Sequence, residues 1–174
     1  MQIALIGIGK IANYQMQAIT HTPGIKLIDA HDLDVNKAEE LPGSVNFHDN
    51  LEKMLQKSRA DAFLVSTPTN SHFEVAMRVI ESDRIAIVEK PLCTSQSEMD
   101  ALITAARTRK LPLYTAFHPA YGREVDWWRE QRDAQNFDLG ALLGLNTCFA
   151  AVSYTHLTLP TINGECRSRW SPYH

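Results

Sequence analysis

The sequence has little of what secreted, membrane-embedded or nucleic-acid-binding proteins need. Its three cysteines (Cys93, Cys148 and Cys166) fit neither a disulfide framework nor the spacing of a metal site. Apolar runs are short and interrupted, so we expect no membrane span, and no basic, apolar leader precedes the first of them. A net charge of −3 gives no reason to expect a nucleic-acid partner. We therefore expect a protein of the reducing cytoplasm, with neither membrane nor nucleic acid as a partner.

Several catalytic signatures are also missing. The sequence has no P-loop, no G-x-S-x-G element and no cluster of metal ligands, and it has no internal repeat or low-complexity tract. What remains is an ordinary globular composition, with 44% hydrophobic and 21% charged residues. A chain of 174 residues can form one domain and the start of a second.

The chain opens on an apolar run that leads into a glycine-rich turn. Residues 3–6 fit a strand that is buried on both faces of a parallel sheet. Gly7 and Gly9 follow, and a helical pattern begins at Lys10, which is the setting in which G-x-G-x-x-G/A predicts a dinucleotide site. Gly7 allows the tight turn, Gly9 lets a pyrophosphate approach the backbone, and Ala12 lets the helix lie close to the strand. The alternative is a glycine turn in some other α/β protein.

Strands and helices alternate along the rest of the chain. The expected strands are residues 25–32, 45–48, 62–66, 85–88 and 111–117, and the expected helices are 11–21, 35–41, 51–57, 73–82, 95–109 and 121–131. Ser95 and Glu98 form an S-x-x-E capping box at the start of the fifth of these helices. The alternation predicts an α/β fold with a doubly wound parallel sheet, a Rossmann-type domain.

Residues with useful chemistry follow several expected strands, namely Gly7, Asp32, Thr67, Lys90 and His118. Ligands of doubly wound sheets bind outside the carboxyl ends of the strands, so we expect one cleft for cofactor and substrate. Asp32 follows Gly9 by 23 residues, the spacing at which a carboxylate accepts the ribose hydroxyls of adenosine. Its charge would repel a 2′-phosphate, which favours NAD over NADP. The alternative is that Asp32 caps the helix at 35–41, although Asp34 is better placed to do so.

Lys90 lies between Glu89 and Pro91 where the fifth strand is expected to end. An ammonium group in a cleft can hydrogen-bond a substrate oxygen, stabilise its negative charge and relay its proton. The alternative is a solvated lysine before a loop proline. His72 begins a helix beside the same cleft, either as a structural residue or as a cofactor contact. His118 follows the sixth strand, either as a substrate contact or as an ordinary loop residue.

Five motifs occur in a fixed order: G-I-G-K-I-A at residues 7–12, D-L-D at 32–34, S-T-P-T-N-S-H at 66–72, E-K-P-L at 89–92 and Y-T-A-F-H at 114–118. Over about residues 2–150 the chain resembles the glucose–fructose oxidoreductase, inositol dehydrogenase and MocA family, and E-K-P is the most specific sign. The resemblance implies an N-terminal NAD(P)-binding Rossmann domain and a C-terminal α/β domain, often used for homo-oligomerisation. It also implies hydride transfer between a nicotinamide and a hydroxyl carbon of a sugar or polyol.

The resemblance implies roles for individual residues as well. Gly7, Gly9, Lys10 and Ile11 would meet the pyrophosphate, Asp32 the adenosine ribose, Thr67, Pro68, Asn70 and His72 the cofactor, Glu89 the nicotinamide ribose, and Lys90 would be the catalytic lysine. Residues 117–121 are most similar to the sugar 1-dehydrogenase branch, of galactose or arabinose type. Ala120 stands where that branch usually has Arg, so the sugar stays open. Two alternatives are a reductase of the same family with a biliverdin- or imine-type substrate, and a non-catalytic dinucleotide sensor.

The end of the sequence departs from this pattern. Residues 139–151 read as the first strand of a second domain. Residues 152–161 and 166–174 can be encoded by strings that resemble the two ends of a transposase-type sequencing adapter. We therefore expect a Rossmann domain at residues 1–120, the beginning of a second domain at 121–151, and translated adapter at 152–174. The alternative is a genuine tail. If residues 152–174 are translated adapter, the catalytic Asp and His residues that the resemblance implies for the second domain are missing, and we expect the piece to be inactive.

Overall fold

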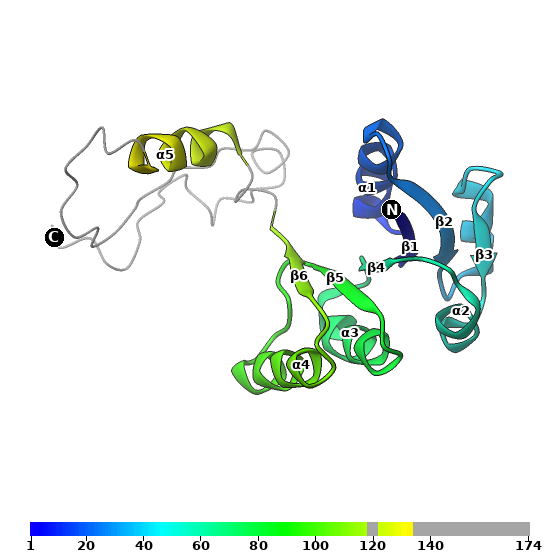
Figure 1. Ribbon diagram of the computed structural model, residues 1–174. Coiled ribbons are helices and arrows are strands. Elements are labelled where there is room, and N and C mark those ends of the chain that lie inside the picture. Colours follow the sequence, from blue (N-terminus) through cyan, green and yellow to red (C-terminus); the bar gives the residue numbers. More distant parts are fainter. Residues whose placement is uncertain (118–121, 134–174) are drawn as a thin grey trace, which may run out of the picture. The chain divides into compact units, whose positions relative to one another are not determined.

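The computed structural model describes residues 1–117 and 122–133 (Figure 1). The chain divides into two units, Met1–Asp126 and Trp127–His174. The sheet and the candidate site both lie in the first of them. His118 and the expected strand at 139–151 lie outside the described residues.

A parallel sheet of six strands forms the centre of the first unit. The strands are β1 (Gln2–Ile6), β2 (Lys26–His31), β3 (Asn46–His48), β4 (Ala62–Val65), β5 (Ile85–Glu89) and β6 (Leu113–Ala116). Their order across the sheet is β3-β2-β1-β4-β5-β6, and every neighbouring pair is parallel. This order confirms the predicted doubly wound sheet, and its winding direction reverses between β1 and β4.

Helices connect the strands. They are α1 (Lys10–His21), α2 (Leu51–Lys57), α3 (His72–Glu81), α4 (Gln96–Thr108) and α5 (Arg123–Asp133), with short 3₁₀ helices η1 (Val35–Glu40) and η2 (Thr69–Ser71). None of the helices described is long and apolar enough to cross a membrane.

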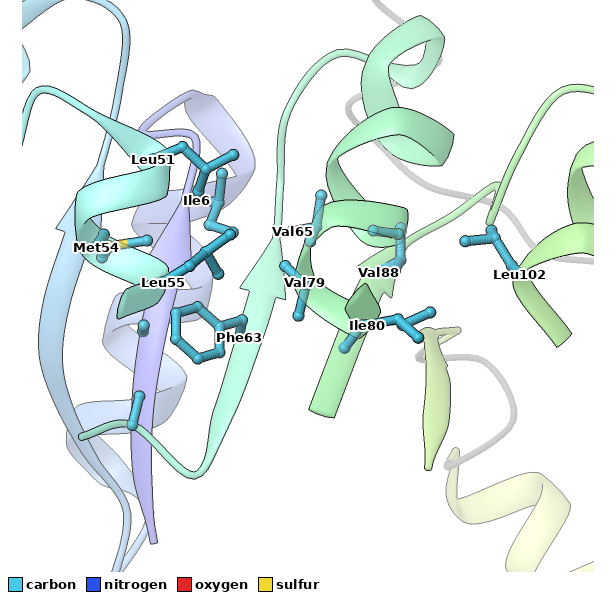
Figure 2. Close-up of a cluster of buried hydrophobic side chains, with 14 of the residues drawn as sticks. Ile6, Leu51, Met54, Leu55, Phe63, Val65, Val79, Ile80, Val88 and Leu102 are labelled. Carbon is cyan, nitrogen blue, oxygen red and sulfur yellow. The ribbon is translucent and has the colours of Figure 1, made fainter. Parts of the chain in front are cut away.

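Alternation along the strands gives the sheet two apolar faces. On β1, Ala4 and Ile6 contribute to one buried cluster and Ile3 and Leu5 to the other. Figure 2 shows the first cluster, in which Leu55 of α2 lies beside Phe63 of β4, and Val79 and Ile80 of α3 lie on the side of Val65 and Val88. On the opposite face, α1 supplies the buried helical residues. A strand that is apolar on both sides is therefore explained by helices on both faces.

Most expected elements lie within two residues of the observed ones, and the differences have local causes. The expected helix at 35–41 is the 3₁₀ helix η1, which has no buried residue and so no packed face to sustain an α-helix. The expected strand at 111–117 begins only at Leu113. Leu111 instead donates its N–H to Ala106 O at the end of α4, and Pro112 has no N–H to donate.

Side chains cap the N-termini of two helices. The Asn50 side chain accepts from Lys53 N–H at 2.9 Å and so caps α2. The capping box of Ser95 and Glu98 is present in full and begins α4. Hydrogen bonds from Thr94 and Ser95 hold the pKa of the Glu98 carboxyl below its ordinary value.

A buried carboxylate joins β2 to β3 and to the segment after α2. Asp29 on β2 is 5% exposed, and its oxygens lie 2.6 Å from Ser58 Oγ, 2.8 Å from His48 Nε2 and 3.1 Å from Asn46 Nδ2. Burial opposes ionisation of Asp29, but the donors from Ser58, His48 and Asn46 outweigh it, and the pKa of Asp29 is lowered.

We predict that Ser58→Ala lowers the free energy of unfolding at pH 7 by about 1–3 kcal/mol, because it removes a donor from a buried carboxylate. The ionised Asp29 stabilises the fold fully above its unfolded pKa, near 3.8, and this contribution is lost as pH falls through the lower folded pKa. The difference between variant and parent should therefore shrink below that pH. Urea unfolding at pH 7 and at acidic pH measures it.

The exposed loop residue Ser44 provides the control, since Ser44→Ala should change stability by less than about 0.5 kcal/mol. A Ser58→Ala difference that stays constant from neutral to acidic pH would contradict the role given to Asp29.

Candidate functional site

The turn between β1 and α1 is pressed against both neighbouring strands. Gly7 has φ +91°, and a Cβ there would lie 2.8 Å from Ser66 O and 2.9 Å from Thr67 N. Its N–H donates to His31 O at the end of β2, at 2.8 Å. A side chain at this position would meet backbone atoms in a strained conformation, so the turn requires glycine.

Gly9 differs from Gly7 in its surroundings. A Cβ added to Gly9 would meet no heavy atom within 4 Å, so the space outside it is open. Gly9 is also the N-cap of α1, and no side chain caps this helix. The first turn of α1 therefore offers backbone N–H groups and a positive partial charge to an anion that approaches Gly9.

Asp32 lies directly under this turn. Its Oδ2 accepts the N–H of Ile8 at 2.7 Å, and its Oδ1 accepts the N–H of Asp34 at 2.9 Å. Each carboxylate oxygen keeps a second lone pair for a ligand hydroxyl. Asp34, not Asp32, caps η1 through Asn36 N–H at 3.0 Å, so the alternative role for Asp32 is wrong. The contact between Asp32 and a ribose stays a prediction.

A pocket of about 410 Å³ opens beside Asp32. Its lining includes four of the predicted site residues, namely Gly7, Asp32, Thr67 and Pro68. It also includes the charged residues Asp49, Glu52, Glu74 and Arg78. Arg78 is paired with Glu74 at 2.6 Å and with Glu52 at 3.6 Å. The pocket holds four carboxylates and one guanidinium, so its net charge is negative. A negative pocket favours ligand hydroxyl groups, which donate hydrogen bonds, over an additional phosphate group on the ligand.

The residues around the turn fit a dinucleotide. The hydroxyl of Thr67 is buried and has no hydrogen-bond partner among the described residues, so it has a donor and lone pairs to offer a ligand. The open space at Gly9 accommodates a diphosphate, and the carboxylate of Asp32 matches a pair of ribose hydroxyls.

Lys90 is exposed and directly follows β5. The peptide bond between Lys90 and Pro91 is cis. The N–H of Lys90 donates to Oε2 of Glu89 at 3.1 Å, while Oε1 of Glu89 accepts from Gln15 Nε2 at 2.6 Å. Since the carboxyl ends of parallel strands share one edge of the sheet, Glu89 and Lys90 lie at the edge where the glycine turn lies.

His72 is only 2% exposed and begins α3. Its Nδ1 lies 2.7 Å from Pro91 O and its Nε2 lies 2.8 Å from Thr67 O. The ring thus joins the loops that follow β4 and β5, which gives His72 a structural role. A contact between His72 and a cofactor stays a prediction.

The remaining predicted residues are more peripheral in the structure. Lys10 and Ile11 lie exposed in the first turn of α1, and Asn70 lies exposed in η2. His118 lies outside the described residues. Among residues 1–117 and 122–133 no cluster of His, Cys, Asp or Glu could hold a metal ion.

The sequence alone predicts no role for Gln15, Ser66 or Arg78. The position of Gln15 could have indicated a buried polar contact, because it is a polar residue next to Met16 and three positions after Ala12, on the buried side of α1. The position of Arg78 gives no such indication, since an arginine on an exposed helix face is ordinary.

Comparison with known proteins identifies the family of this chain. A family model described as an oxidoreductase family with an NAD-binding Rossmann fold, GFO_IDH_MocA, matches residues 1–117. The chain belongs to this family. The resemblance carried by the five motifs is thereby confirmed, and NAD, the predicted cofactor, is the one that the family's domain binds.

Relatives of this chain include two inositol dehydrogenases. Scyllo-inositol 2-dehydrogenase (NAD(+)) of Bacillus subtilis is 28% identical over 137 residues, which cover 72% of this chain and 40% of the relative. Myo-inositol 2-dehydrogenase of Thermotoga maritima is 24% identical over 139 residues, covering 75% and 40%. The structure of the WlbA dehydrogenase of Bordetella pertussis, solved with NADH and UDP-GlcNAcA, matches this chain with a TM-score of 0.69 at 23% identity. The match covers 79% of this chain and 43% of the WlbA chain, and it shows that the fold is shared. The chain spans about 40% of the length of these curated relatives.

We predict opposite consequences for alanine at the two glycines of the turn. Gly7→Ala should lower the free energy of unfolding by about 1–3 kcal/mol, because of its positive φ and the contact with Ser66 O. Gly9→Ala should leave stability unchanged within about 0.5 kcal/mol. It should nevertheless weaken NADH binding by about tenfold or more, because the methyl group occupies the space that a phosphate needs.

Urea unfolding and titration of NADH fluorescence measure the two effects. Gly43→Ala is the control for both, since a Cβ there also meets no atom within 4 Å and Gly43 is remote from the turn. Strong NADH binding by the Gly9→Ala variant would contradict the place given to the diphosphate.

Proposed function

We propose that this chain is the NAD-binding part of a dehydrogenase that oxidises a hydroxyl carbon of a sugar or polyol. The observation that carries the proposal is the position of Lys90, at the carboxyl end of β5 on the edge that also holds the glycine turn. The inositol dehydrogenases among the relatives support the substrate class.

The strand order supports one placement of the dinucleotide. The pocket beside Asp32, after β2, would take the adenosine, and the N-terminus of α1, after β1, would take the diphosphate. The next strands along the same direction are β4 and β5. The nicotinamide half would therefore lie over the ends of these strands, beside Thr67, Glu89 and Lys90.

NAD, when bound, supplies the acceptor for a hydride. Lys90 Nζ would donate a hydrogen bond to the substrate hydroxyl and so orient the carbon that is oxidised. As that carbon gives up a hydride and the oxygen gives up its proton to solvent, a carbonyl forms. The ammonium of Lys90 would stabilise the negative charge that develops on the oxygen. Asp32 and the carboxylates of the adenosine pocket would favour NAD over NADP.

The wider setting of the protein belongs to the same proposal. The scarcity of cysteine supports the cytoplasm as its compartment, and the family resemblance supports a homo-oligomer. The division into residues 1–120, 121–151 and 152–174, with translated adapter in the last segment, is tested by the source nucleotide sequence. Codons unlike those of an adapter would reject that part.

We predict that Lys90→Met lowers turnover by about 10²- to 10³-fold, because the substrate oxygen loses its charged donor. NAD affinity should change by less than about twofold, since Lys90 acts on the substrate. Turnover is measured in the longest chain that the gene encodes, with a panel of inositols, monosaccharides and UDP-sugars. Lys57→Met, on the exposed end of α2, is the control.

The outcomes separate the alternatives. Retained turnover in the Lys90→Met variant would reject the role of Lys90. Binding of NAD with no turnover on any substrate would favour a dinucleotide sensor, and turnover only with imine- or biliverdin-type compounds would favour a reductase.

We also predict that Asp32→Asn raises the affinity for NADP relative to NAD by about tenfold, because a negative charge is removed from beside the 2′ position. Titration with the two dinucleotides gives the ratio. Glu52→Gln removes a charge from the same pocket without a predicted ribose contact, so its effect on the ratio should be smaller. An unchanged ratio in Asp32→Asn would count against the ribose contact.

A further inference from the structure

One side chain of α1 connects the ends of two strands of the sheet. The amide of Gln15 donates through Nε2 to Oε1 of Glu89 on β5, at 2.6 Å. Through Oε1 the same amide accepts from Oγ of Ser66, which follows β4, at 2.5 Å. We infer that Gln15 is a positioning residue, which fixes the Glu89 carboxylate so that it can bind the ribose next to the nicotinamide. The inference rests on the proposed function.

Two hydrogen bonds from the protein hold the carboxylate of Glu89. Besides Gln15 Nε2 on Oε1, the N–H of Lys90 donates to Oε2 at 3.1 Å. Each oxygen of this half-buried carboxylate thus has one donor from the protein and keeps a second lone pair. A carboxylate held at both oxygens loses little rotational freedom when it accepts the two hydroxyls of a ribose.

The two partners of Gln15 call for an amide at this position. A carboxylate only accepts hydrogen bonds, and here the hydroxyl of Ser66 donates one, so the residue between them must present a donor and an acceptor side by side. An apolar residue would remove the hydrogen bonds at Glu89 Oε1 and Ser66 Oγ, and a glutamate would bring two carboxylates together. The neighbouring Ala12 and Met16 are buried and apolar, so packing alone would favour an apolar residue at position 15 as well.

The position of Glu89 at the end of β5 fits a contact with the second ribose of the dinucleotide. Neighbouring strands lie about 4.8 Å apart, so the end of β5 lies about 10 Å from the end of β1, two strands away. A ribose attached to a diphosphate at the N-terminus of α1 can reach that far. Because Gln15 belongs to the same helix as the diphosphate-binding turn, one rigid element would align both contacts.

The test compares three ligands that grow along the dinucleotide: ADP, ADP-ribose and NADH. ADP lacks the second ribose, ADP-ribose contains it, and NADH adds the nicotinamide. Gln15→Met keeps the size of the side chain and removes both hydrogen bonds. Calorimetry with this chain should show ADP affinity within about twofold of the parent, and ADP-ribose and NADH weakened by roughly tenfold.

Two further variants make the test specific. Ser66→Ala removes the other end of the bridge and should give the same pattern more weakly, and adding it to Gln15→Met should cost nothing more. Glu89→Gln should show the same selective loss, which checks the ribose contact itself. Ser66→Ala leaves α1 intact and so keeps the test of the bridge valid if Gln15→Met is poorly folded. Gln17→Met, an exposed glutamine on the same helix, should bind all three ligands like the parent.

The outcomes separate the inference from the function on which it rests. An equal loss of affinity for ADP, ADP-ribose and NADH would mean that Gln15 has a purely structural role. Unchanged affinity for all three ligands would mean that Gln15 has no role in binding. Either result overturns the inference. A parent chain that binds none of the three ligands would overturn the proposed function itself, and that result appears before any variant is compared.

Discussion

The close approach of the β1–α1 turn to the strands on either side of β1 is the constraint on which the rest of the site depends. Gly7 donates to the end of β2, and Ser66 N–H donates to Ile6 O at the end of β1, at 2.8 Å in each case. Asp32 adds a third connection through Ile8 N–H. Three strand ends are thereby gathered around one turn, and α1 leaves that turn with its N-terminus uncapped by any side chain.

Fixing the turn also fixes what lies further along the same edge. Gln15, in the middle of α1, forms hydrogen bonds with Ser66 and Glu89. The ring of His72 lies within hydrogen-bond distance of the carbonyls of Thr67 and Pro91. Both residues that flank Lys90 are therefore held, while Lys90 itself stays exposed. Such an arrangement fixes the backbone of a lysine and leaves its ammonium group to a ligand, as pre-organisation of a polar site requires.

Local sequence signals were sufficient for most of the fold. The apolar run at β1, the glycines after it and the Ser95–Glu98 capping box each depend on neighbours within a few residues, and each is confirmed. The bridge made by Gln15 depends on partners 51 and 74 residues away, which no local pattern reveals. The helix expected at 35–41 is present as a 3₁₀ helix, and its type could not be predicted for a related reason, since tertiary packing decides whether a short helical pattern becomes an α-helix.

The distribution of charge along the sheet edge separates two tasks. At the β2 and β3 side, carboxylates outnumber cations around the pocket beside Asp32, and at the β5 end a carboxylate and an ammonium are adjacent in the chain. Under the proposed function, the first arrangement would select the cofactor, and the second would act on a substrate oxygen whatever the rest of the substrate is. Relatives that bear the names of different inositol dehydrogenases share this domain. Under the proposed function, recognition of one sugar or polyol over another would therefore depend on residues other than those gathered at this edge, because the groups found here would contact parts that all such substrates have in common.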